Sequence, residues 1–540
     1  MSLRMPVSYL YIDFTPSVSK SQQGFRDLRI KARKMRILTP YHRKKKGGAG
    51  VEREEIKREL SAIFSDMTDF AFRELYFEGN TITVAYLVGF CSRTYVNQYI
   101  LEPISRAYTA SGGKGLPPLE SLITNIKLEP IDDVTSAATA ILSGNAFVFS
   151  DTMRDILGLS VFTKNDDGRS PMEPETENVI RGPHEGFTES AEGNVVLLRR
   201  RLRSARLKRR SLTVGWDTST DVSVLFMEGL AREEAVEEVC RRLRAIDTDS
   251  ILDSGYIEIF LQDGCVPFYP TVGNSERPDK VAAKLMEGRI AIVVDGSPVV
   301  LTVPYLFCEA FQVTEDYAKS PWYASFVRLL RFAAYLMALY FPAFFVAAFV
   351  RHRGILPAFL TDAVDGARET LGFSLFWEVL IIFLIFETVR EVGLRMPKAV
   401  GSAVGLVGSL ILGDSAIKAG LTSAPVLVVV ALAAVCSFIV PPYMNANMLY
   451  RLMMIVIGGA LGFLGLFTAI LISVAVLASR TSLGVPYLSP LAPLDPRGMK
   501  DFLCMAPLWA MRRMPVSLTG KRLIRTRSGR PNGKRGSGRS

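Results

Sequence analysis

The chain of 540 residues is 49% hydrophobic and 22% charged, with a formal net charge of +11. These averages suit a soluble protein, but the mean hydropathy is positive despite 64 Lys and Arg, so the apolar residues must be segregated along the chain. Three histidines and six scattered cysteines without a CxxC pair give no metal-binding or histidine-based catalytic pattern, and they fit a reducing compartment.

Residues 1–50 predict a flexible basic arm. The segment ends in HRKKKGGAG (His42–Gly50), and such a run of lysines and glycines cannot bury a core. Its role is open between solubility and attraction to anionic lipid headgroups, which contributes about 1 kcal/mol per Lys or Arg near a membrane. The first residues lack the apolar stretch and cleavage site of a signal peptide, so we expect the N-terminal 320 residues to stay in the cytoplasm.

Two soluble α/β subdomains are expected next, at 51–162 and 178–318, with a polar stretch between them. The first subdomain alternates segments of helical spacing with short strand-like apolar runs. The helical segments are Glu52–Phe64 and Asn97–Ala110, and the strand-like runs are Ile82–Phe90 and Ala146–Ser150.

The second subdomain repeats this order of elements. Asp221–Leu230 predicts a strand that runs into a turn, and Arg232–Ile246 predicts an amphipathic helix. Arg289–Pro304 predicts a hairpin, because an Asp-Gly turn lies between two β-branched runs. The similarity of ITVAYLVGF in the first subdomain to VSVLFMEGL in the second indicates that the two are related.

The basic run Leu197–Arg210 raises the question of nucleic-acid binding. No aromatic residues alternate with its basic ones, and no nucleic-acid-binding motif accompanies it. We therefore expect a solvated helix face there and no nucleic-acid partner.

Residues 320–480 predict an all-α polytopic transmembrane bundle. Phe332–Val350, Ala424–Val440 and the 27 residues of Leu452–Ala478 contain no charged side chain. A helix rises about 1.5 Å per residue, so roughly 20 apolar residues cross a hydrocarbon layer about 30 Å thick. A further span is expected at Leu371–Leu394, which is apolar apart from four charged residues.

Glu378 and Glu387 are the charged residues of this further span that need an explanation. A charge at the centre of a membrane helix costs about 2.5–3.5 kcal/mol, so such residues usually face other helices or water. Their spacing puts them about 180° apart around one helix. Glu387 shares a face with Arg390 and Glu391 and fits a salt-bridged helix end. Glu378 lies deeper, and it is the stronger candidate to line a conduction path or to bind a partner helix.

Glycines mark the candidate packing positions of the bundle. Ala399–Gly413 is short and rich in small residues, and it forms either a re-entrant hairpin or a thin span packed through Gly401 and Gly405. The last span carries a GxxxG pair, Gly458 and Gly462, which favours close helix packing or oligomerisation.

Charge counting predicts the orientation of the bundle. Arg395 and Lys398 follow the expected span Leu371–Leu394. The chain from Arg480 to its last residue, including a basic tail at 481–540, carries 13 Lys and Arg. The positive-inside rule puts both on the cytoplasmic side, so the number of crossings is even. Four full spans with a re-entrant segment at 399–413 satisfy this condition.

Four ordered stretches resemble the signature sequences of the GerA family of spore germination proteins. They are ETENVIRGPHEGFTES (Glu175–Ser190), DTDSILDSGYIE (Asp247–Glu258), GNSERPDKVAAKLMEGRIAIVVDGSP (Gly273–Pro298) and LGVPYLSPLAPLD (Leu483–Asp495). The resemblance runs from about Glu52 to Asp495 and is closest to the A subunit of a nutrient germinant receptor. The chain departs from the family in the two prolines of IVPPYMNAN (Ile439–Asn447) and in its long basic tail.

The resemblance implies two α/β subdomains on the cytoplasmic, spore-core side and a multi-pass bundle in the spore inner membrane. It also implies a homo-oligomer that works with a transporter-like B subunit and a lipoprotein C subunit, and that acts as a ligand-gated ion channel. No catalytic residue, cofactor or metal is expected, so the chain is not expected to be an enzyme.

Two of the family motifs supply further candidate contact residues. In ERPD, Arg277 lies between two acids and next to a proline, which suits either a charged anchor at a subdomain or subunit contact or a plain helix start. RGPHEGF predicts an irregular loop, and no nucleophile and base occur together in it. The candidate residues are Arg181, Gly182, Pro183, Glu276, Arg277, Pro278 and Asp279.

Two other functions stay open. Within the family, the chain could be a paralogue like stage V sporulation protein AF, which is associated with dipicolinic acid release. In a different class, it could be a stand-alone secondary transporter, which predicts inverted repeats and broken helices around a midplane site. The hydrophobic block has at most five segments and no convincing repeat, which favours the receptor.

Overall fold

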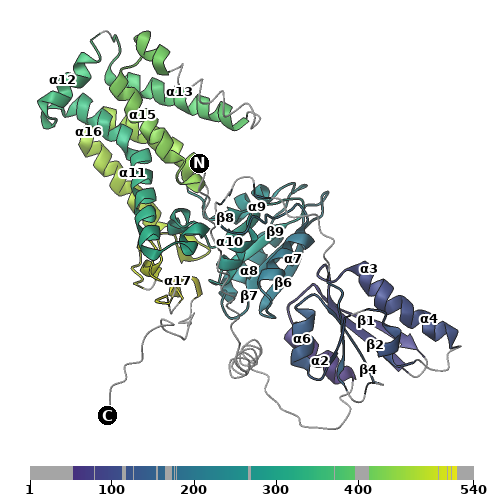
Figure 1. Cartoon of the computed structure of the whole chain (residues 1–540). Helices are drawn as coiled ribbons and strands as arrows, with labels where there is room; N and C mark the ends of the chain where they lie inside the picture. The colour runs from purple at the N-terminus through teal and green to yellow at the C-terminus, as the bar shows by residue number, and fades with distance from the viewer. Residues whose placement is uncertain are drawn as a thin grey trace, which may run out of the picture. The chain divides into compact units, whose positions relative to one another are not determined.

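The computed structural model describes residues 53–519 apart from 78–79, 112–116, 126, 152, 154–155, 165–172, 175–176, 178, 180, 265–268, 370, 396–412, 497, 508 and 512–513. The expected arm at 1–50 and the candidate positions Gly401 and Gly405 lie outside the described residues. The chain divides into two compact units (Figure 1). The first comprises residues up to Ser65 with Phe70–Asn165 and Arg203–Ala205, and the second comprises Asp66–Asp69, Asp166–Leu202 and residues from Arg206 onward.

The first unit is built on a five-stranded sheet in the order β1-β2-β4-β5-β3, in which every neighbouring pair is antiparallel. Its elements are α2 (Arg53–Ile63), β1 (Phe70–Phe77), β2 (Asn80–Leu87), α3 (Arg93–Val96), a π turn η1 (Asn97–Leu101), α4 (Glu102–Ala110), α5 (Leu119–Leu122), β3 (Leu128–Ile131), α6 (Val134–Ile141), β4 (Ala146–Ser150) and β5 (Gly158–Val161). These bounds confirm the predicted helices and strands of this region.

The second unit begins with a sheet in the order β6-β7-β9-β10-β8, again antiparallel throughout. Its elements are α7 (Ala191–Arg201), β6 (Leu207–Val214), β7 (Thr220–Met227), α8 (Glu233–Arg244), α9 (Ser254–Leu261), β8 (Gly273–Ser275), α10 (Pro278–Leu285), β9 (Ile290–Val294) and β10 (Val300–Val303). The predicted strand, amphipathic helix and hairpin are confirmed, with β9 and β10 flanking the Asp-Gly turn.

The two sheets have the same topology. Numbered within its own unit, each sheet has its strands in the order first, second, fourth, fifth and third. Helices also separate the same strands, since α3–α5 and α8–α9 follow the second strand while α6 and α10 follow the third. The predicted relationship between the two subdomains is therefore confirmed at the level of topology.

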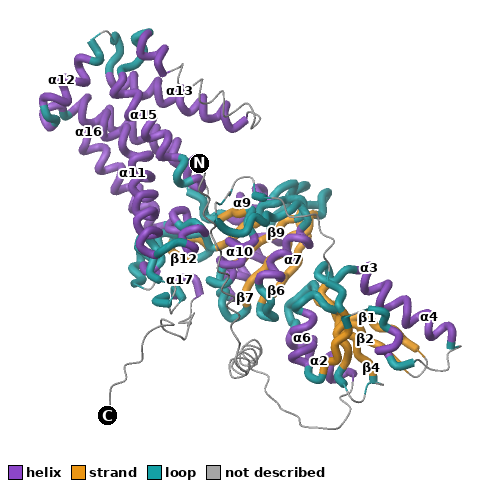
Figure 2. Tube along the Cα trace, viewed as in Figure 1, coloured by secondary structure: helices purple, strands orange, loops and turns teal. Residues whose placement is uncertain are grey.

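Helices cover both faces of the second sheet (Figure 2). Successive side chains of a strand point to opposite faces. Val222 and Val224 of β7 accordingly pack with α8 and α9, whereas Leu225 and Met227 pack with α7 and α10. Because both faces are buried, β9 and the last four residues of β7 are continuously apolar rather than alternating.

The basic run Leu197–Arg210 does not form the solvated helix face expected from its composition. Its first residues end α7 and its last begin β6. Arg199 is buried and holds both carboxylate oxygens of Asp69 at 2.8 Å, and Lys208 is buried as well. The prediction is wrong because tertiary ion pairs, which sequence spacing does not reveal, take these charges out of water.

A helical region follows the second sheet in the same unit. Its elements are the 3-10 turns η2 (Phe307–Phe311) and η3 (Thr314–Ala318), α11 (Pro321–Arg351), η4 (Arg353–Ile355), α12 (Ala358–Gly366), α13 (Leu375–Arg395), α15 (Ala424–Ser437), η5 (Pro441–Tyr443), α16 (Met444–Ser479), β11 (Thr481–Ser482), β12 (Val485–Pro486), η6 (Gly498–Lys500) and α17 (Val516–Thr519). The predicted fold class, two α/β subdomains followed by a helical part, is confirmed.

Two segments of the described chain are long and apolar enough to cross a membrane, namely Pro321–Arg351 and Pro441–Ser479. Helix α15 is apolar but shorter, with 14 residues. Exposed apolar side chains are frequent on all of these helices, as expected where lipid is the solvent.

Helix α16 turns back on itself. A straight helix of its 36 residues would be about 54 Å long. Yet the hydroxyl of Tyr443, directly before the helix, lies 3.2 Å from that of Tyr487, soon after it. Gly462 in the middle has φ +63° and ψ −150°, which is not a helical conformation. The two halves of α16 therefore form a helical hairpin whose turn is at Gly462.

Both arms of this hairpin pack on the same stretch of α11. In the first arm, a Cβ on Gly458 would lie 2.8 Å from the Ala343 carbonyl oxygen, so the two backbones are in close contact. In the second arm, the rings of Phe467 and Phe344 are 5.7 Å apart. The run Leu452–Ala478, predicted as a span, lies in a segment that is long and apolar enough to cross a membrane, but the path of this segment reverses at Gly462. Glycine tolerates the positive φ that this reversal requires.

Candidate coupling site between the second sheet and the helices

An ionic cluster fixes the start of α11 to the segments on either side of the helical region. Arg328 Nε donates to Asp316 Oδ2 at 3.0 Å, and Arg331 Nη2 donates to Asp316 Oδ1 at 2.7 Å. Arg328 Nη1 also donates to Asp501 Oδ1 at 2.9 Å and to the Phe502 carbonyl at 3.0 Å. A bidentate, multiply bonded guanidinium of this kind holds its partners in one geometry.

Burial and charge oppose each other at the central carboxylate. Arg328 is 0% exposed and Asp316 is 1% exposed. Burial raises the pKa of Asp316, but the hydrogen bonds and charges of Arg331 and Arg328 outweigh it, so the pKa lies below its ordinary value. Asp316 is therefore ionised at neutral pH and carries the pairing of both arginines.

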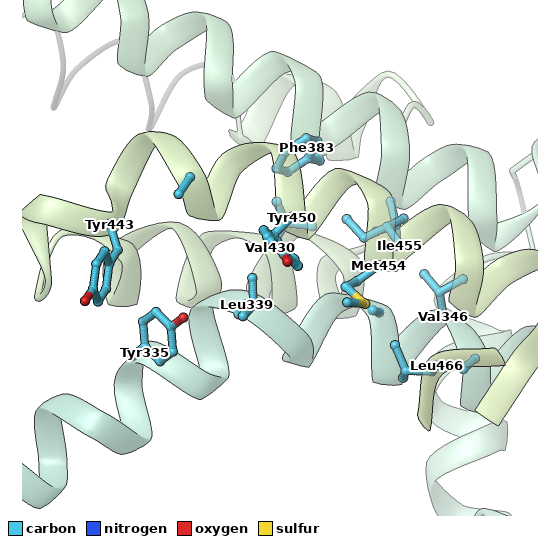
Figure 3. Packing of buried hydrophobic residues seen from close by; sticks show 14 of the residues in the cluster. Tyr335, Leu339, Val346, Phe383, Val430, Tyr443, Tyr450, Met454, Ile455 and Leu466 are labelled. Atoms are coloured by element: carbon cyan, nitrogen blue, oxygen red, sulfur yellow. The ribbon is translucent and has the colours of Figure 1, made fainter. Parts of the chain in front are cut away.

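Aromatic side chains continue this junction into the helices. The hydroxyls of Tyr269 and Tyr335 lie 2.9 Å apart, which joins the loop before β8 to α11. Tyr443, at the start of α16, donates to the Phe307 carbonyl at 2.9 Å, and its ring stacks on that of Phe307. Figure 3 shows Tyr335 beside Tyr443 at one end of the buried cluster. Buried tyrosines have an apolar ring and a hydroxyl that needs a partner, and both requirements are met here.

The chain after α16 is bonded to segments that directly flank the strands and helices of the second sheet. Ser482 Oγ donates to the Thr271 carbonyl at 2.6 Å and accepts from the Tyr305 amide at 3.0 Å. The Leu483 amide donates to Asp263 at 2.7 Å, and the Phe307 amide donates to the Tyr487 carbonyl at 3.0 Å. The family-like stretch Leu483–Asp495 thus packs where the sheet, α11 and α16 meet.

A buried charged trio supports the junction from the sheet side. Arg289 Nη1 lies 2.5 Å from Glu309 Oε2, and Lys284 Nζ lies 3.3 Å from the same oxygen. Lys284 also donates to Thr302 at 2.9 Å. Burial lowers the pKa of Lys284 to about 8, although the charge of Glu309 acts in the opposite direction.

The structure brings the two predicted family motifs together. Arg277 is 2% exposed, and its Nε and Nη2 bind Asp279 at 3.0 and 2.7 Å. A Cβ on Gly182 would lie 3.3 Å from Arg277 Nη2, and the Glu276 carbonyl accepts from the Phe187 amide at 2.8 Å. Pro278 begins α10, and Arg277 is its N-cap. Arg181 and Pro183 are exposed.

Glu177 completes this contact. Its carboxylate accepts from Ser275 Oγ at 2.5 Å and from the Glu276 amide at 3.2 Å, and it also pairs with Lys280. Burial raises the pKa of Glu177, but Lys280 and the hydrogen bonds together lower it by more, so the pKa lies below its ordinary value. Glu177 lies in the family-like stretch Glu175–Ser190, but its sequence context does not distinguish it from the other acidic residues there.

Glu378 lies in the first turn of α13, rather than deep in a span as the sequence suggested. It is 1% exposed. Its carboxylate accepts from Arg368 Nε at 2.8 Å and from the Ser423 amide and hydroxyl, both at 2.6 Å. Ser423 is the N-cap of α15, so Glu378 joins the N-terminal ends of two helices.

Glu387 pairs with Arg390 at 2.7 Å and with Arg451 of α16 at 3.5 Å. The expected pairing within α13 is therefore present, and it extends to a second helix. Gly458 lies against α11, and Gly462 forms the turn of α16 beneath His352. Among the residues that the structure describes, no group of three or more His, Cys, Asp or Glu is placed to hold a metal ion.

Most residues of the junction could not be identified from the sequence. Arg328 and Arg331 lie next to the apolar run Phe332–Val350, where basic residues are typical of a membrane boundary. Nothing in the sequence indicates a role for Asp316, Asp501 or Tyr269. A signal was present, since tyrosine hydroxyls and paired charges at the ends of apolar runs need buried partners. The sequence does not reveal which distant residues supply these partners.

Comparisons with known proteins find relatives that are similar to this chain along most of its length. A family model described as Bacillus/Clostridium GerA spore germination protein matches residues 58–517. The chain is 36% identical over 449 residues to spore germination protein KA of Bacillus subtilis (strain 168), and the match covers 82% of each chain. It is 34% identical over 461 residues to the uncharacterized membrane protein YfkQ of the same organism, covering 84% of this chain and 89% of that one.

A solved structure is also similar to part of the chain. It is the crystal structure of the N-terminal domain of the A subunit of the Bacillus megaterium spore germinant receptor GerK3. The match covers 48% of this chain and 99% of that one, with 27% sequence identity and a TM-score of 0.37.

Proposed function

Because the chain belongs to the GerA family of spore germination proteins, as a non-enzymatic A-type subunit with two candidate membrane spans, we propose that it transmits a nutrient signal to an ion-conducting membrane assembly. The observation that carries this proposal is the buried junction of Asp316, Arg328, Asp501 and the tyrosines. Packed, ion-paired contacts would pass a displacement of the sheet to α11 and α16, because such interfaces are not continuously deformable.

The assembly that we propose is a homo-oligomer around a pore, with a transporter-like B subunit and a lipoprotein C subunit as partners. We place it as a multi-pass protein in the spore inner membrane, in contact with its lipids. Residues 482–487 bond to segments that flank the second sheet, which supports placing these residues and the sheet on the same side of the membrane. We take this side to be the cytoplasmic side.

The domain boundaries are part of the proposal. We assign 1–50 to a basic arm, 51–162 and 178–318 to the two sheet subdomains, 320–480 to the membrane domain, and 481–540 to a C-terminal cytoplasmic segment. The identical strand order of the two sheets supports the division into two subdomains.

A flux measurement tests the proposal. The chain is reconstituted into liposomes with its B and C partners, and ion release is followed after a nutrient is added. We expect nutrient-dependent release, and Tyr443→Phe should weaken it while the complex still assembles, because the variant keeps the ring but loses the bond to Phe307. Complexes that assemble but release no ions with any nutrient would contradict the proposal.

Glu378 gives a second readout of the membrane part. Its position between α13, α15 and Arg368 supports a role in holding these helices in their conducting or resting arrangement. Glu378→Gln should change ion conductance or germination rate while membrane insertion stays intact. The exposed Glu391, which pairs only with Arg395 in the described structure, supplies the control variant Glu391→Gln. An unaltered response would reduce Glu378 to a packing residue.

A further inference from the structure

A polar cluster in the helical region has more hydrogen-bond donors than acceptors. It consists of Glu387 and Arg390 on α13 and of Asn447 and Arg451 on α16. Asn447 and Arg451 are each 1% exposed and lie one turn apart on the same helix face. The two arginines and one carboxylate leave a net charge of +1.

The donors of this cluster lack partners. Within the part of the chain that the structure describes, Nε and Nη2 of Arg451, Nε and Nη1 of Arg390, and both amide atoms of Asn447 have no hydrogen-bond partner. Glu387 occupies only one nitrogen of each guanidinium, at 2.7 and 3.5 Å. A buried donor without a partner costs free energy, and a buried charge without a counter-charge costs more.

The surrounding side chains do not supply the missing negative charge. Arg451 lies 5.7 Å from the ring centroid of Phe383, and Arg390 Nη2, besides its pairing with Glu387, contacts the uncharged Met448 sulfur at 3.4 Å. Residues 396–412, which follow α13 directly in the sequence, contain one lysine and no Asp or Glu. The counter-charge must therefore come from outside the local chain.

We propose that this cluster binds a small monovalent anion, either a halide or a carboxylate of one or two carbons. Because Arg451 and Asn447 are almost fully buried, a ligand of a few atoms fits the cluster better than a lipid headgroup or the side chain of a partner protein. Arg390, whose side chain is 12% exposed, marks the side from which the ion enters. Charge-assisted bonds from two guanidinium groups and one amide would hold it. The site does not depend on the channel proposed above, because its test measures binding and not flux.

The test uses the full chain in detergent. Thermal unfolding is followed while chloride or formate replaces gluconate, an anion too large for the site, at constant total salt. A ligand that binds only the folded state raises the melting temperature along a saturable curve. We expect this curve for chloride, for formate or for both, and the two salts distinguish a halide from a carboxylate. Equal melting temperatures in all three salts would overturn the proposal and leave at most water at the cluster.

Variants locate the site. Arg451→Gln should raise the half-saturating anion concentration at least about tenfold, since a charge-assisted bond is lost. Arg395→Gln is the matched control, because Arg395 is on α13 but is exposed and pairs with Glu391. An unchanged anion response in Arg451→Gln would overturn the proposal. If Arg451→Gln does not fold, the variant Asn447→Ala, which leaves no charge unpaired, must show a higher half-saturating anion concentration. Chloride-35 NMR line broadening must show the same weakening of anion binding in that variant.

Discussion

Lys284 is a buried charged residue of the junction whose effect on stability can be measured through its pH dependence. It lies under the second sheet with its ammonium beside Glu309 and Thr302, and its pKa is lowered to about 8. In the unfolded chain a lysine titrates near 10.4. Between these two values the unfolded state binds more protons than the folded state, so stability rises with pH over this range.

Replacing Lys284 by Met should remove this rise. The wild-type protein should gain on the order of 1–3 kcal/mol between pH 8 and about 10, seen as an increasing melting temperature, whereas Lys284→Met should be flat. Arg289 still pairs with Glu309 in the variant, so the carboxylate is not left alone. Lys280→Met on the same helix is the control and should keep the wild-type slope. A rise that persists in Lys284→Met would assign it to another group.

At the scale of elements, the turn inside α16 shows how one residue determines the path of a whole helix. A Cβ on Gly462 would lie 2.4 Å from His352 Cε1, in addition to the cost of a positive φ for any other residue. The carbonyl of Gly459, just before the turn, accepts from Arg351 Nε at 3.3 Å. Non-helical backbone at membrane depth requires such a protein partner.

Gly462→Ala should therefore destabilise the protein by about 2 kcal/mol or more, or prevent its insertion, because the backbone and His352 must both move. Gly393→Ala is the matched control, since Gly393 lies in α13 with no atom within 4 Å of an added Cβ. Alanine at a free helical position should be neutral or stabilise by up to about 1 kcal/mol. Equal melting temperatures and yields of the two variants would contradict the hairpin.

At the scale of the whole molecule, the segment after α16 contributes to the junction between the second sheet and the helices. A chain that ends at Arg480 loses Asp501 and the backbone carbonyls that bind Arg328. Breaking a buried pair by removing one partner costs about 3–5 kcal/mol, because a charge stays buried and uncompensated. This truncation should lower the melting temperature strongly and abolish the nutrient response.

A chain that ends at Thr519 supplies the comparison. It keeps every described contact of the junction, so its free energy of unfolding should match that of the full chain to within about 0.5 kcal/mol. The melting temperatures of the two chains should therefore be nearly equal. If the two truncated chains were equally stable, residues 481–519 would have no structural part in the junction.

The sequence by itself determined the order of the elements, the two related α/β subdomains, the apolar helices and the family. These features depend on local periodicity and on runs of residue types, which are written along the chain. A helix start at Arg277 is one of the two interpretations of the ERPD motif, because proline is common at the first position of a helix.

Only the tertiary structure decided where the charges go and which way the last helix runs. Arg199, Glu378 and Arg328 each find partners at sequence separations that no spacing rule predicts, because burial and ion pairing depend on distant segments. The reversal at Gly462 likewise needs a conformation that glycine permits but does not require. Packing of both arms against α11 selects it, and that contact exists only in the folded chain.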